Sequence, residues 1–320
     1  MSSYRAGIVG LGQVGLMFDE DEKRDGVWTH FSAYEALGGK VDIVAVCDPD
    51  TGRCQQALDR KPGVHVYEAL EDMLHQESLD MVSLCTPPSV HAEQIQACAG
   101  RVKAIICEKP LADQFDSAEA AVYSCQEMDT VLAVNYYKRF DGAVPAVKGL
   151  LEKGRIGTLT QVNAWYAGPF EAVGSHMIDL LRFFCGELSV QTVSEAGEDA
   201  YQAHLTSVEG VRINLSVTGK REDLIFECDL VGTEGRLRLL ENCRDYEWYQ
   251  FEPSARYSGY RELVRRETAG WQAPERFLPL FEEVIELLGG NQKELTSSGH
   301  SALETQRLMD DISKVWRNHE

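Results

Sequence analysis

Three glycines near the N-terminus place the strongest constraint on the fold of this chain. Gly10, Gly12 and Gly15 directly follow the apolar run 6–9 and lead into an apolar helical start. In a strand–turn–helix unit the first glycine permits the tight turn, the second lets the backbone approach a pyrophosphate, and the third lets helix and strand pack closely. The helix N-terminus then offers free N–H groups to phosphate. A simple glycine-rich turn is the alternative, but this context favours a dinucleotide-binding unit.

An acidic residue at the end of the second strand completes this signal. Asp48 follows the apolar run 43–47, where a carboxylate can accept both ribose hydroxyls of an adenosine. Asp48 favours NAD because it would repel a 2′-phosphate, whereas the nearby Arg53 leaves NADP open. Within the glycine turn, Gln13 and Val14 are also predicted to contact the cofactor.

The distance from the glycines to Asp48 indicates an insertion. It is about a dozen residues longer than the usual spacing, so residues 18–29, with the charged stretch 18–26, are predicted to interrupt the chain before a helix that begins near His30. The insertion is either a solvated loop or a lid. We favour the loop, although its place beside the pyrophosphate keeps the lid open.

The first half of the chain alternates short β-branched runs with helical patterns, which is the rhythm of a parallel sheet covered by helices on both faces. Strands are predicted at 6–9, 43–47, 64–66, 81–85, 104–107 and 131–134, and helices at 30–37, 51–60, 68–76, 89–99 and 116–128. This pattern predicts an α/β fold whose first domain, residues 1–138, is a Rossmann domain with a doubly wound parallel sheet.

After about residue 140 the rhythm changes. Strands are predicted at 158–167, 188–194, 200–207, 211–219, 224–231 and 235–240, and helices at 144–153, 172–184, 275–288 and 301–317. Glu209-Gly210 and Thr233-Glu234-Gly235 supply turns for two hairpins. We therefore expect a second, α+β domain with a largely antiparallel open sheet over residues 139–320. Its last helix could pack back on the first domain.

Length and charge narrow the possible partners. The chain has 320 residues, enough for two ordinary domains, and its 51 acidic against 31 basic residues give a net charge of −20. Such a surface repels polyanions, so we expect neither nucleic acid nor an anionic membrane as a partner.

The cysteines and apolar runs indicate where the protein works. Nine cysteines are spread along the chain without a C-x-x-C pair, and no histidine cluster has zinc-ligand spacing. Their apolar contexts fit buried, reduced thiols, and neither a signal peptide nor a twenty-residue apolar span is recognisable. We therefore expect a cytoplasmic protein and predict no metal site.

Three further segments carry chemistry and suggest a family. Thr86–His91 follows the fourth strand, Cys107–Ala112 follows the fifth, and Gly174–Leu181 lies on the isolated helix of the second domain. With the glycine turn, and in this order, they resemble the glucose-fructose oxidoreductase, inositol dehydrogenase and rhizopine catabolism family (Gfo/Idh/MocA) over almost the whole chain. The resemblance implies an NAD(P)-dependent oxidoreductase that acts on CH–OH groups.

The resemblance implies catalytic roles for two residues, and general chemistry supports both roles. Hydride transfer from a carbinol needs a base for the hydroxyl proton and a group that polarises the oxygen. Lys109 is placed at the carboxyl end of a parallel strand, where open α/β sheets bind ligands, and Pro110 can hold the chain in a fixed turn, with a cis peptide as one form. By similarity His176 is the base and Lys109 the polarising group. Taken singly, each would be an ordinary surface lysine or core histidine.

The second-domain helix also departs from the family pattern. Many members carry an aspartate one turn before the histidine, where this chain has Ala172 with Glu171 beside it. Glu171 points about a hundred degrees away on a regular helix, so it could substitute only if the helix starts after it. Asp179, one turn beyond His176, either contacts substrate and tunes the site or bonds to nearby backbone.

Weaker candidates come from the ends of other strands. By analogy Thr86, Pro87 and His91 border the nicotinamide, with an ordinary strand-to-helix turn as the alternative, and Glu108 joins Lys109 among the predicted cofactor contacts. Tyr137 and Arg139 follow the last Rossmann strand and could serve either a substrate pocket or the junction between domains. For Trp165 and Tyr166 we favour a structural role.

Two functions remain open at this level. The first is a hydride transfer between nicotinamide and a carbinol or carbonyl of a sugar, cyclitol or sugar nucleotide. The second is a dinucleotide-binding regulator or pseudoenzyme without turnover, which the missing aspartate would explain. Retention of Lys109 and His176 favours the enzyme. By similarity we also expect a homodimer or homotetramer formed through the free face of the second-domain sheet, which would otherwise leave apolar area exposed.

Overall fold

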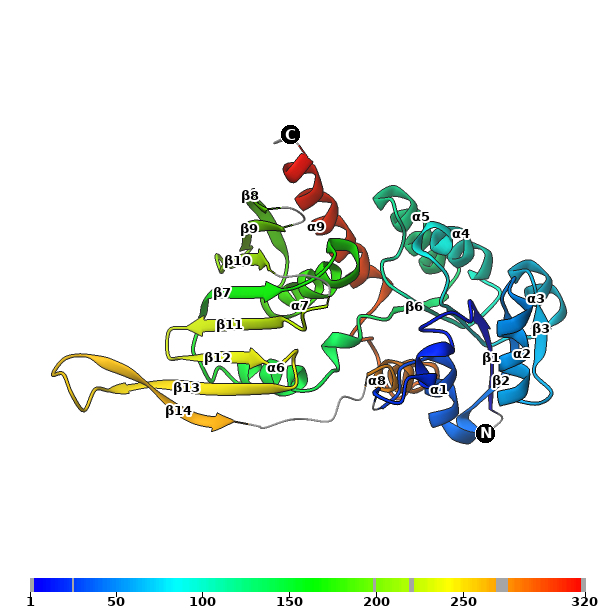
Figure 1. The fold of residues 1–320 in the computed structure, drawn as a ribbon, viewed down its shortest axis with the longest axis horizontal. Coiled ribbons are helices and arrows are strands. Elements are labelled where there is room, and N and C mark those ends of the chain that lie inside the picture. Colours follow the sequence, from blue (N-terminus) through cyan, green and yellow to red (C-terminus); the bar gives the residue numbers. More distant parts are fainter. Residues whose placement is uncertain (1–2, 25, 198–199, 219–221, 269–275, 318–320) are drawn as a thin grey trace. The chain divides into compact units, whose positions relative to one another are not determined.

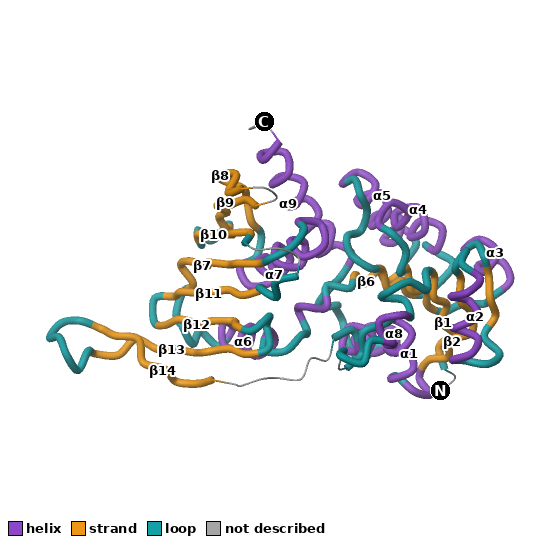
Figure 2. The backbone as a smooth tube through the Cα atoms, viewed as in Figure 1, coloured by secondary structure: helices purple, strands orange, loops and turns teal. Residues whose placement is uncertain are grey.

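A computed structural model of the protein describes residues 3–24, 26–197, 200–218, 222–268 and 276–317. Its internal contacts divide the chain into two compact units, Met1–Tyr137 with Glu275–Gln306, and Lys138–Pro274 with Arg307–Glu320. Figure 2 shows strands alternating with helices in unit 1 and successive strands running together in unit 2. Contacts assign residues 275–306 to unit 1, whereas the predicted second domain took in all of residues 139–320.

Unit 1 is built on a parallel sheet of six strands in the order β3-β2-β1-β4-β5-β6. The strands are β1 (Tyr4–Val9), β2 (Val41–Cys47), β3 (His65–Tyr67), β4 (Met81–Leu84), β5 (Ala104–Cys107) and β6 (Val131–Val134). The strand order reverses between β1 and β4, and the carboxyl ends of these strands flank the crevice where open α/β sheets bind dinucleotides. The predicted Rossmann sheet is therefore confirmed.

Helices cover both faces of this sheet (Figure 1). They are α1 (His30–Ala36), α2 (Thr51–Arg60), α3 (Leu70–Gln76), α4 (Pro88–Cys98), α5 (Phe115–Glu127) and α8 (Leu278–Leu288), with 3₁₀ turns η1 (Met17–Glu20) and η2 (Gly38–Lys40). Helices α3, α4 and α5 share one buried apolar cluster with the sheet, while α1 contacts α8. Near-continuous apolar runs such as 104–107 form strands here because both of their faces are buried.

Unit 2 carries an eight-stranded sheet in the order β14-β13-β12-β11-β7-β10-β9-β8. Its strands are β7 (Leu159–Tyr166), β8 (Leu188–Gly197), β9 (Ala200–Ser207), β10 (Arg212–Val217), β11 (Phe226–Gly232), β12 (Gly235–Leu240), β13 (Asp245–Pro253) and β14 (Arg261–Thr268). Only the neighbours β7 and β10 run parallel; the other pairs are antiparallel, so the predicted largely antiparallel sheet is confirmed.

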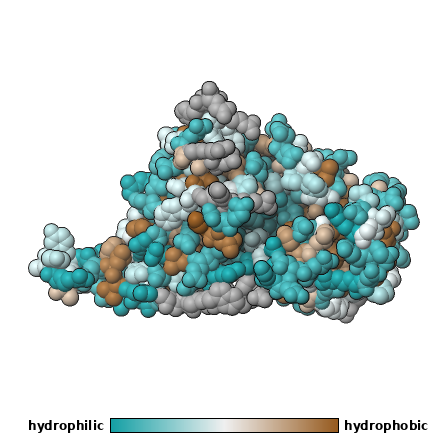
Figure 3. Space-filling view, viewed as in Figure 1, coloured by the Kyte–Doolittle hydropathy of each residue, from teal (hydrophilic) through white to brown (hydrophobic). Residues whose placement is uncertain are grey.

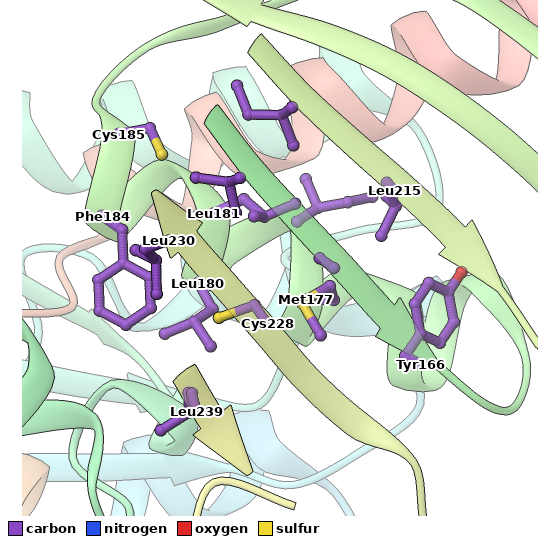
Figure 4. Close-up of a cluster of buried hydrophobic side chains, with 14 of the residues drawn as sticks. Tyr166, Met177, Leu180, Leu181, Phe184, Cys185, Leu215, Cys228, Leu230 and Leu239 are labelled. Atoms are coloured by element: carbon purple, nitrogen blue, oxygen red, sulfur yellow. The ribbon is translucent and has the colours of Figure 1, made fainter. Parts of the chain in front are cut away.

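One face of the second sheet is covered by helices. These are α6 (Val144–Glu152), the π-helical turn η4 (Phe170–Gly174) that runs into α7 (Ser175–Cys185), and the end of α9 (Gly299–Arg317), with the 3₁₀ turn η3 (Tyr137–Arg139) before them. Figure 4 shows Leu180 and Leu181 of α7 gathered with Cys228 and Leu230 of β11. These four side chains are almost wholly buried in one apolar cluster. This packing fixes the helix that carries His176.

The other face of the second sheet carries a row of polar side chains, and Trp165 of β7 lies on the same face and is 37% exposed. Neighbouring strands place one continuous row of side chains across this face: His204, Asn214, Asn163, Asp229, Arg238 and Glu247. Adjacent members bond to one another, as Asn214 does to Asn163 at 2.7 Å and Arg238 to Glu247 at 2.9 Å. Cross-strand pairing therefore satisfies polar groups of this row, and an assembly through this face stays a prediction.

The sequence missed the hairpin formed by β13 and β14, because charged residues interrupt any apolar alternation there. Five of the eight residues of β14 are arginine or glutamate, and most side chains of this strand are exposed. The hairpin is held instead by its backbone ladder and by pairs such as Arg265 with Glu247 at 3.2 Å. Of the predicted elements, residues 219 and 275 lie outside the described residues, as does Asp25 of the insertion.

On the face drawn in Figure 3 the surface is largely hydrophilic, and hydrophobic residues form small separated groups. Within the described part of the chain, no helix is long and apolar enough to cross a membrane. All nine cysteines are buried.

We expect Leu230→Ala to destabilise unit 2 by about 2–5 kcal/mol, because it removes a fully buried side chain from the cluster under α7. The measurement is the free energy of unfolding in urea, followed by circular dichroism. Val231→Ala is the matched control, since the neighbouring Val231 is only partly buried. Equal losses in the two variants would contradict this account of the core.

Candidate active site

The glycine turn after β1 is shaped by backbone contacts that exclude side chains. Gly10 has φ +87°, and a Cβ on it would lie 2.8 Å from the carbonyl of Cys85. A Cβ on Gly15 would lie 2.0 Å from the carbonyl oxygen of Gly10. Gly12 differs, because the nearest atom to a Cβ there is 3.9 Å away on Arg53. The first and third glycines therefore serve the fold, and the second faces open space, as a phosphate-binding turn requires.

The predicted insertion interrupts the helix that follows this turn. Residues 12–16 begin a helical turn, with the amide of Leu16 donating to Gly12 at 3.0 Å. The inserted residues follow, and α1 begins after them. There the amide of His30 donates to the carbonyl oxygen of Val14 at 2.9 Å, and the amide of Phe31 donates to that of Gly15 at 3.2 Å. Helix α1 thus continues the turn across the inserted residues.

The base of the insertion is anchored rather than freely solvated. The Asp19 carboxylate accepts from Thr29 at 2.6 Å and Ser32 at 3.1 Å, and it pairs with Arg60 at 2.7 Å. Arg24 stacks over Phe18 at 3.7 Å from the ring centroid. Among the described residues of the insertion, 20–23 and 26 are exposed, as the favoured interpretation as a solvated loop predicts.

A cavity of about 750 Å³ opens at the switch point of the first sheet. Its lining includes most of the predicted cofactor residues: Gly10, Gly12, Gln13, Val14, Asp48, Thr86 and Pro87. Gly15 supports the turn from behind. The sequence did not single out Glu68, Leu70 and Gln94, which also line the cavity, because helix and loop positions of this kind carry no motif.

Asp48 connects β2 to the glycine turn. One carboxylate oxygen accepts the amide of Leu11 at 2.7 Å and the other accepts the amide of Asp50 at 2.9 Å, while Arg53 lies 3.5 Å away. Asp48 is 3% exposed, and these two backbone amides hold its carboxylate at the cavity wall. Arg53 has a side chain 42% exposed and stands beside it.

Glu108 and Lys109 follow β5 directly, at the carboxyl edge of the first sheet. Lys109 is partly buried and joined to Pro110 by a cis peptide. Burial lowers the pKa of the Lys109 ammonium, and the charge of Glu108 opposes that change. Burial would raise the pKa of Glu108, but a hydrogen bond with His30, the charges of His30 and Lys109, and a hydrogen bond from Asn135 lower it below its usual value. The charge of each group therefore favours the charged form of the other.

His91 binds two loops together. Its Nδ1 lies 2.8 Å from the carbonyl oxygen of Pro110 and its Nε2 lies 2.7 Å from that of Thr86. The ring is fully buried, and these two contacts provide hydrogen-bond partners for both of its nitrogens. The Thr86 hydroxyl donates to Gln94 at 2.5 Å. A role of His91 at the nicotinamide stays a prediction.

In unit 2, His176 lies at the start of α7 and is 7% exposed. The π-helical turn η4 begins at Phe170, so the helical winding starts before Glu171. The condition under which Glu171 could replace the missing aspartate is therefore not met. Ala172 is exposed. Glu171 instead lies near a buried tyrosine pair: burial raises the pKa of Tyr166, and the charge of Glu171 adds to it.

Arg139 and Asp179 are paired with each other inside unit 2. The guanidinium donates to both carboxylate oxygens, at 2.8 Å and 2.6 Å, and neither residue is more than 4% exposed. The pair joins η3 to α7 one turn beyond His176. Tyr137 belongs to unit 1, where its ring contacts Trp28 and Phe277. A direct substrate contact for any of the three stays a prediction.

The fold and the cavity together define a dinucleotide-binding protein of the Rossmann class. Among the residues that the structure describes, no group of three or more His, Cys, Asp or Glu is arranged to hold a metal. The sequence profile of the oxidoreductase family with an NAD-binding Rossmann fold matches residues 4–136. The first domain of the chain is thus similar to the Gfo/Idh/MocA family over residues 4–136.

Two curated dehydrogenases are similar to part of this chain. D-apiose dehydrogenase from Paraburkholderia graminis is 28% identical over 244 residues, 67% of this chain and 65% of that protein. Inositol 2-dehydrogenase from Rubrobacter xylanophilus is 30% identical over 161 residues, 50% of this chain and 43% of that protein. The chain thus spans less than two thirds of the length of both relatives.

Solved structures share the complete fold at low sequence identity. The WlbA dehydrogenase from Bordetella pertussis, solved in complex with NADH and UDP-GlcNAcA, is 21% identical with a TM-score of 0.82, covering 99% of this chain and 96% of that one. A super-repressor mutant of Gal80p from Saccharomyces cerevisiae is 16% identical with a TM-score of 0.79, covering 99% and 97%. The same fold thus occurs in a dehydrogenase and in a repressor.

Removing Asp179 should destabilise unit 2 strongly, because Asp179→Ala leaves the Arg139 guanidinium buried without its carboxylate. We expect a loss of about 3–5 kcal/mol in the free energy of unfolding. Asp310→Ala is the control, since Asp310 pairs with Lys314 on the exposed side of α9 and should cost less than about 1 kcal/mol. Similar losses in both variants would contradict the assignment of a buried ion pair.

Proposed function

We propose that the protein is a nicotinamide-dependent dehydrogenase that transfers a hydride between the cofactor and a carbinol or carbonyl of a sugar, cyclitol or sugar nucleotide. The observation that carries the proposal is Lys109, which follows a parallel strand at the same sheet edge as the glycine turn and is partly buried beside the Glu108 carboxylate. A charged lysine in a desolvated place is suited to polarise a reacting oxygen.

The cavity in unit 1 fits a dinucleotide. The open space at Gly12 lets phosphate approach the backbone, and the turn from Gly12 to Leu16 directs amides toward it. Asp48, at the end of β2, would meet the adenosine ribose. The bound nicotinamide would supply the acceptor or donor of the hydride.

His176 is proposed as the base for the hydroxyl proton. A histidine can exchange a proton near neutral pH, and burial at the start of α7 limits the orientations of its ring. The Arg139–Asp179 pair one turn further along supports that helix end. Lys109 would orient the same hydroxyl and stabilise the charge that develops on its oxygen.

We propose NAD as the preferred cofactor, with NADP as the alternative. The buried Asp48 carboxylate opposes a 2′-phosphate, whereas Arg53, at the cavity wall and paired with both Asp48 and Asp50, could accept one. Since two carboxylates already face Arg53, its charge is largely compensated, which favours NAD.

The substrate class, assembly and location are further parts of the proposal. Relatives named for D-apiose and inositol support a polyhydroxylated substrate. A homodimer or homotetramer through the second sheet would involve a polar face in which Trp165 is 37% exposed. Nine buried thiols support a reducing, cytoplasmic setting.

A regulator without turnover is the second candidate. The observation that favours it is Ala172, exposed in η4 where many family members carry an aspartate. The discriminating measurement is reduction of NAD in a single turnover over a panel of polyols, aldoses and sugar nucleotides. Tight dinucleotide binding with no reduction by any compound would favour the regulator.

Lys109→Ala and His176→Ala should each lower kcat by about a hundredfold to ten-thousandfold, the contribution of a positioned acid–base group. The measurement is the absorbance of reduced nicotinamide with a substrate from the panel. Lys103→Ala and His204→Ala are the controls, because both side chains are exposed in the same two units. Full turnover in either active-site variant would contradict the proposed mechanism.

Arg53→Ala should weaken binding of NADPH by about tenfold, the size of one charge-assisted hydrogen bond. The dissociation constant of NADH should change by less than about twofold. Fluorescence of the reduced cofactor measures both constants. Lys61→Ala removes a cation at the other end of α2, where Lys61 pairs with Asp42, and should change neither. A parallel loss for both cofactors would overturn the role given to Arg53.

A further inference from the structure

A buried polar network lies beneath Lys109, and the proposed mechanism does not use it. His30, the first residue of α1, is completely buried. Its Nδ1 lies 2.8 Å from the hydroxyl of Ser83 on β4, and its Nε2 lies 3.1 Å from the carboxylate of Glu108 after β5. The imidazole therefore spans from the centre of the sheet to the residue next to Lys109.

Glu108 is held on several sides. The same carboxylate oxygen that faces His30 accepts the side-chain amide of Asn135 at 2.6 Å, and the other accepts the backbone amide of Lys109 at 3.3 Å. An ionised carboxylate only accepts hydrogen bonds, so Nε2 of His30 must carry the proton that points at Glu108. Glu108 is 7% exposed, and its charge depends on these donors because water cannot replace them.

The position of His30 is itself fixed by the anchored insertion. Thr29 caps α1 in a reciprocal capping box with Ser32, and Asp19 of the insertion accepts from both hydroxyls. The His30 amide donates to Val14 in the glycine turn. The inserted segment thus locks the end of α1 that delivers the imidazole.

We propose that His30 is a positioning residue of the active site, which acts on Lys109 by holding the Glu108 carboxylate in place beside it. This inference rests on the proposed function, because Lys109 takes part in catalysis only if the protein is that dehydrogenase. Without a donor from His30, Glu108 would lose its fixed place or take up a proton. The Lys109 ammonium would then lose its compensating negative charge.

The other groups that face Glu108 and His30 do not replace this contact. Burial raises the pKa values of the Cys85 and Cys107 thiols, and the nearby charge of Glu108 raises them further. Phe277 and Phe281 meet the His30 ring edge to face, with centroids 5.5 Å and 5.0 Å away.

At the far end of the network, the Tyr34 hydroxyl lies 2.9 Å from Ser83. Burial raises the pKa of Tyr34, so the phenol stays neutral. Tyr34 therefore adds no charge to this network.

Two amide substitutions separate the two contacts of His30. The amide of His30→Gln reaches the position of Nε2 and keeps a donor toward Glu108, whereas the shorter His30→Asn reaches only the position of Nδ1 and keeps the contact with Ser83. Tyr34→Phe is the control, because it removes a buried hydroxyl from the same network without touching Glu108. All variants are made in the full chain.

The primary measurement is the pH dependence of acylation of the Lys109 amine, read by mass spectrometry, which requires no turnover. Loss of the compensating charge makes the ammonium less favourable, so the pKa of Lys109 should fall. We expect the labelling midpoint of His30→Asn to move down by about one pH unit, a tenfold change in proton affinity. His30→Gln and Tyr34→Phe should keep the midpoint of the unaltered protein, and Glu108→Gln should reproduce the effect of His30→Asn.

The outcomes are separable from those of the proposed function. If a substrate is turned over, the alkaline limb of the kcat profile should shift with the labelling midpoint in His30→Asn. If no substrate is turned over but the midpoint still shifts, the enzyme assignment fails and the positioning of Lys109 stands. An unchanged midpoint in His30→Asn, with only a lowered unfolding temperature as in Tyr34→Phe, would show that His30 merely fills space.

Discussion

The close approach of Gly15 to the carbonyl of Gly10 is the constraint on which unit 1 depends. A side chain at Gly15 would place its Cβ 2.0 Å from that oxygen, so only glycine lets the turn close. Once closed, the turn lies between the ends of β1, β2 and β4, and Asp48 can reach the amide of Leu11. The shape of the cavity beside the turn and the start of helix α1 both depend on this close approach.

The insertion shows how a fold can absorb extra chain without losing its site. Helix α1 resumes where the glycine turn left off, because His30 and Phe31 donate to Val14 and Gly15. The inserted residues are then held at their base by Asp19 and Arg60. The same anchoring brings a buried imidazole to Glu108, so the extra segment and the active-site edge are physically connected.

In each unit, buried charged side chains lie close in sequence to a proposed catalytic residue. In unit 1, Glu108 stands next to Lys109 and is held by His30 and Asn135. In unit 2, Arg139 and Asp179 hold the first turns of α7, which carries His176. Buried charges of this kind contribute little net stability, because desolvation offsets their attraction. Their value lies in fixing the orientation of neighbouring groups.

The sequence by itself determined the parallel sheet, the glycine turn, Asp48 and the positions of Lys109 and His176. Local spacing encodes these features, since turn geometry and strand periodicity depend on near neighbours. Only the tertiary structure decided that Arg139 pairs with Asp179, that a polar row crosses the outer face of the second sheet, and that His30 reaches Glu108. These contacts join residues that are 40, 9 or more, and 78 positions apart. No local pattern records such pairs, because their partners are chosen when strands and helices pack.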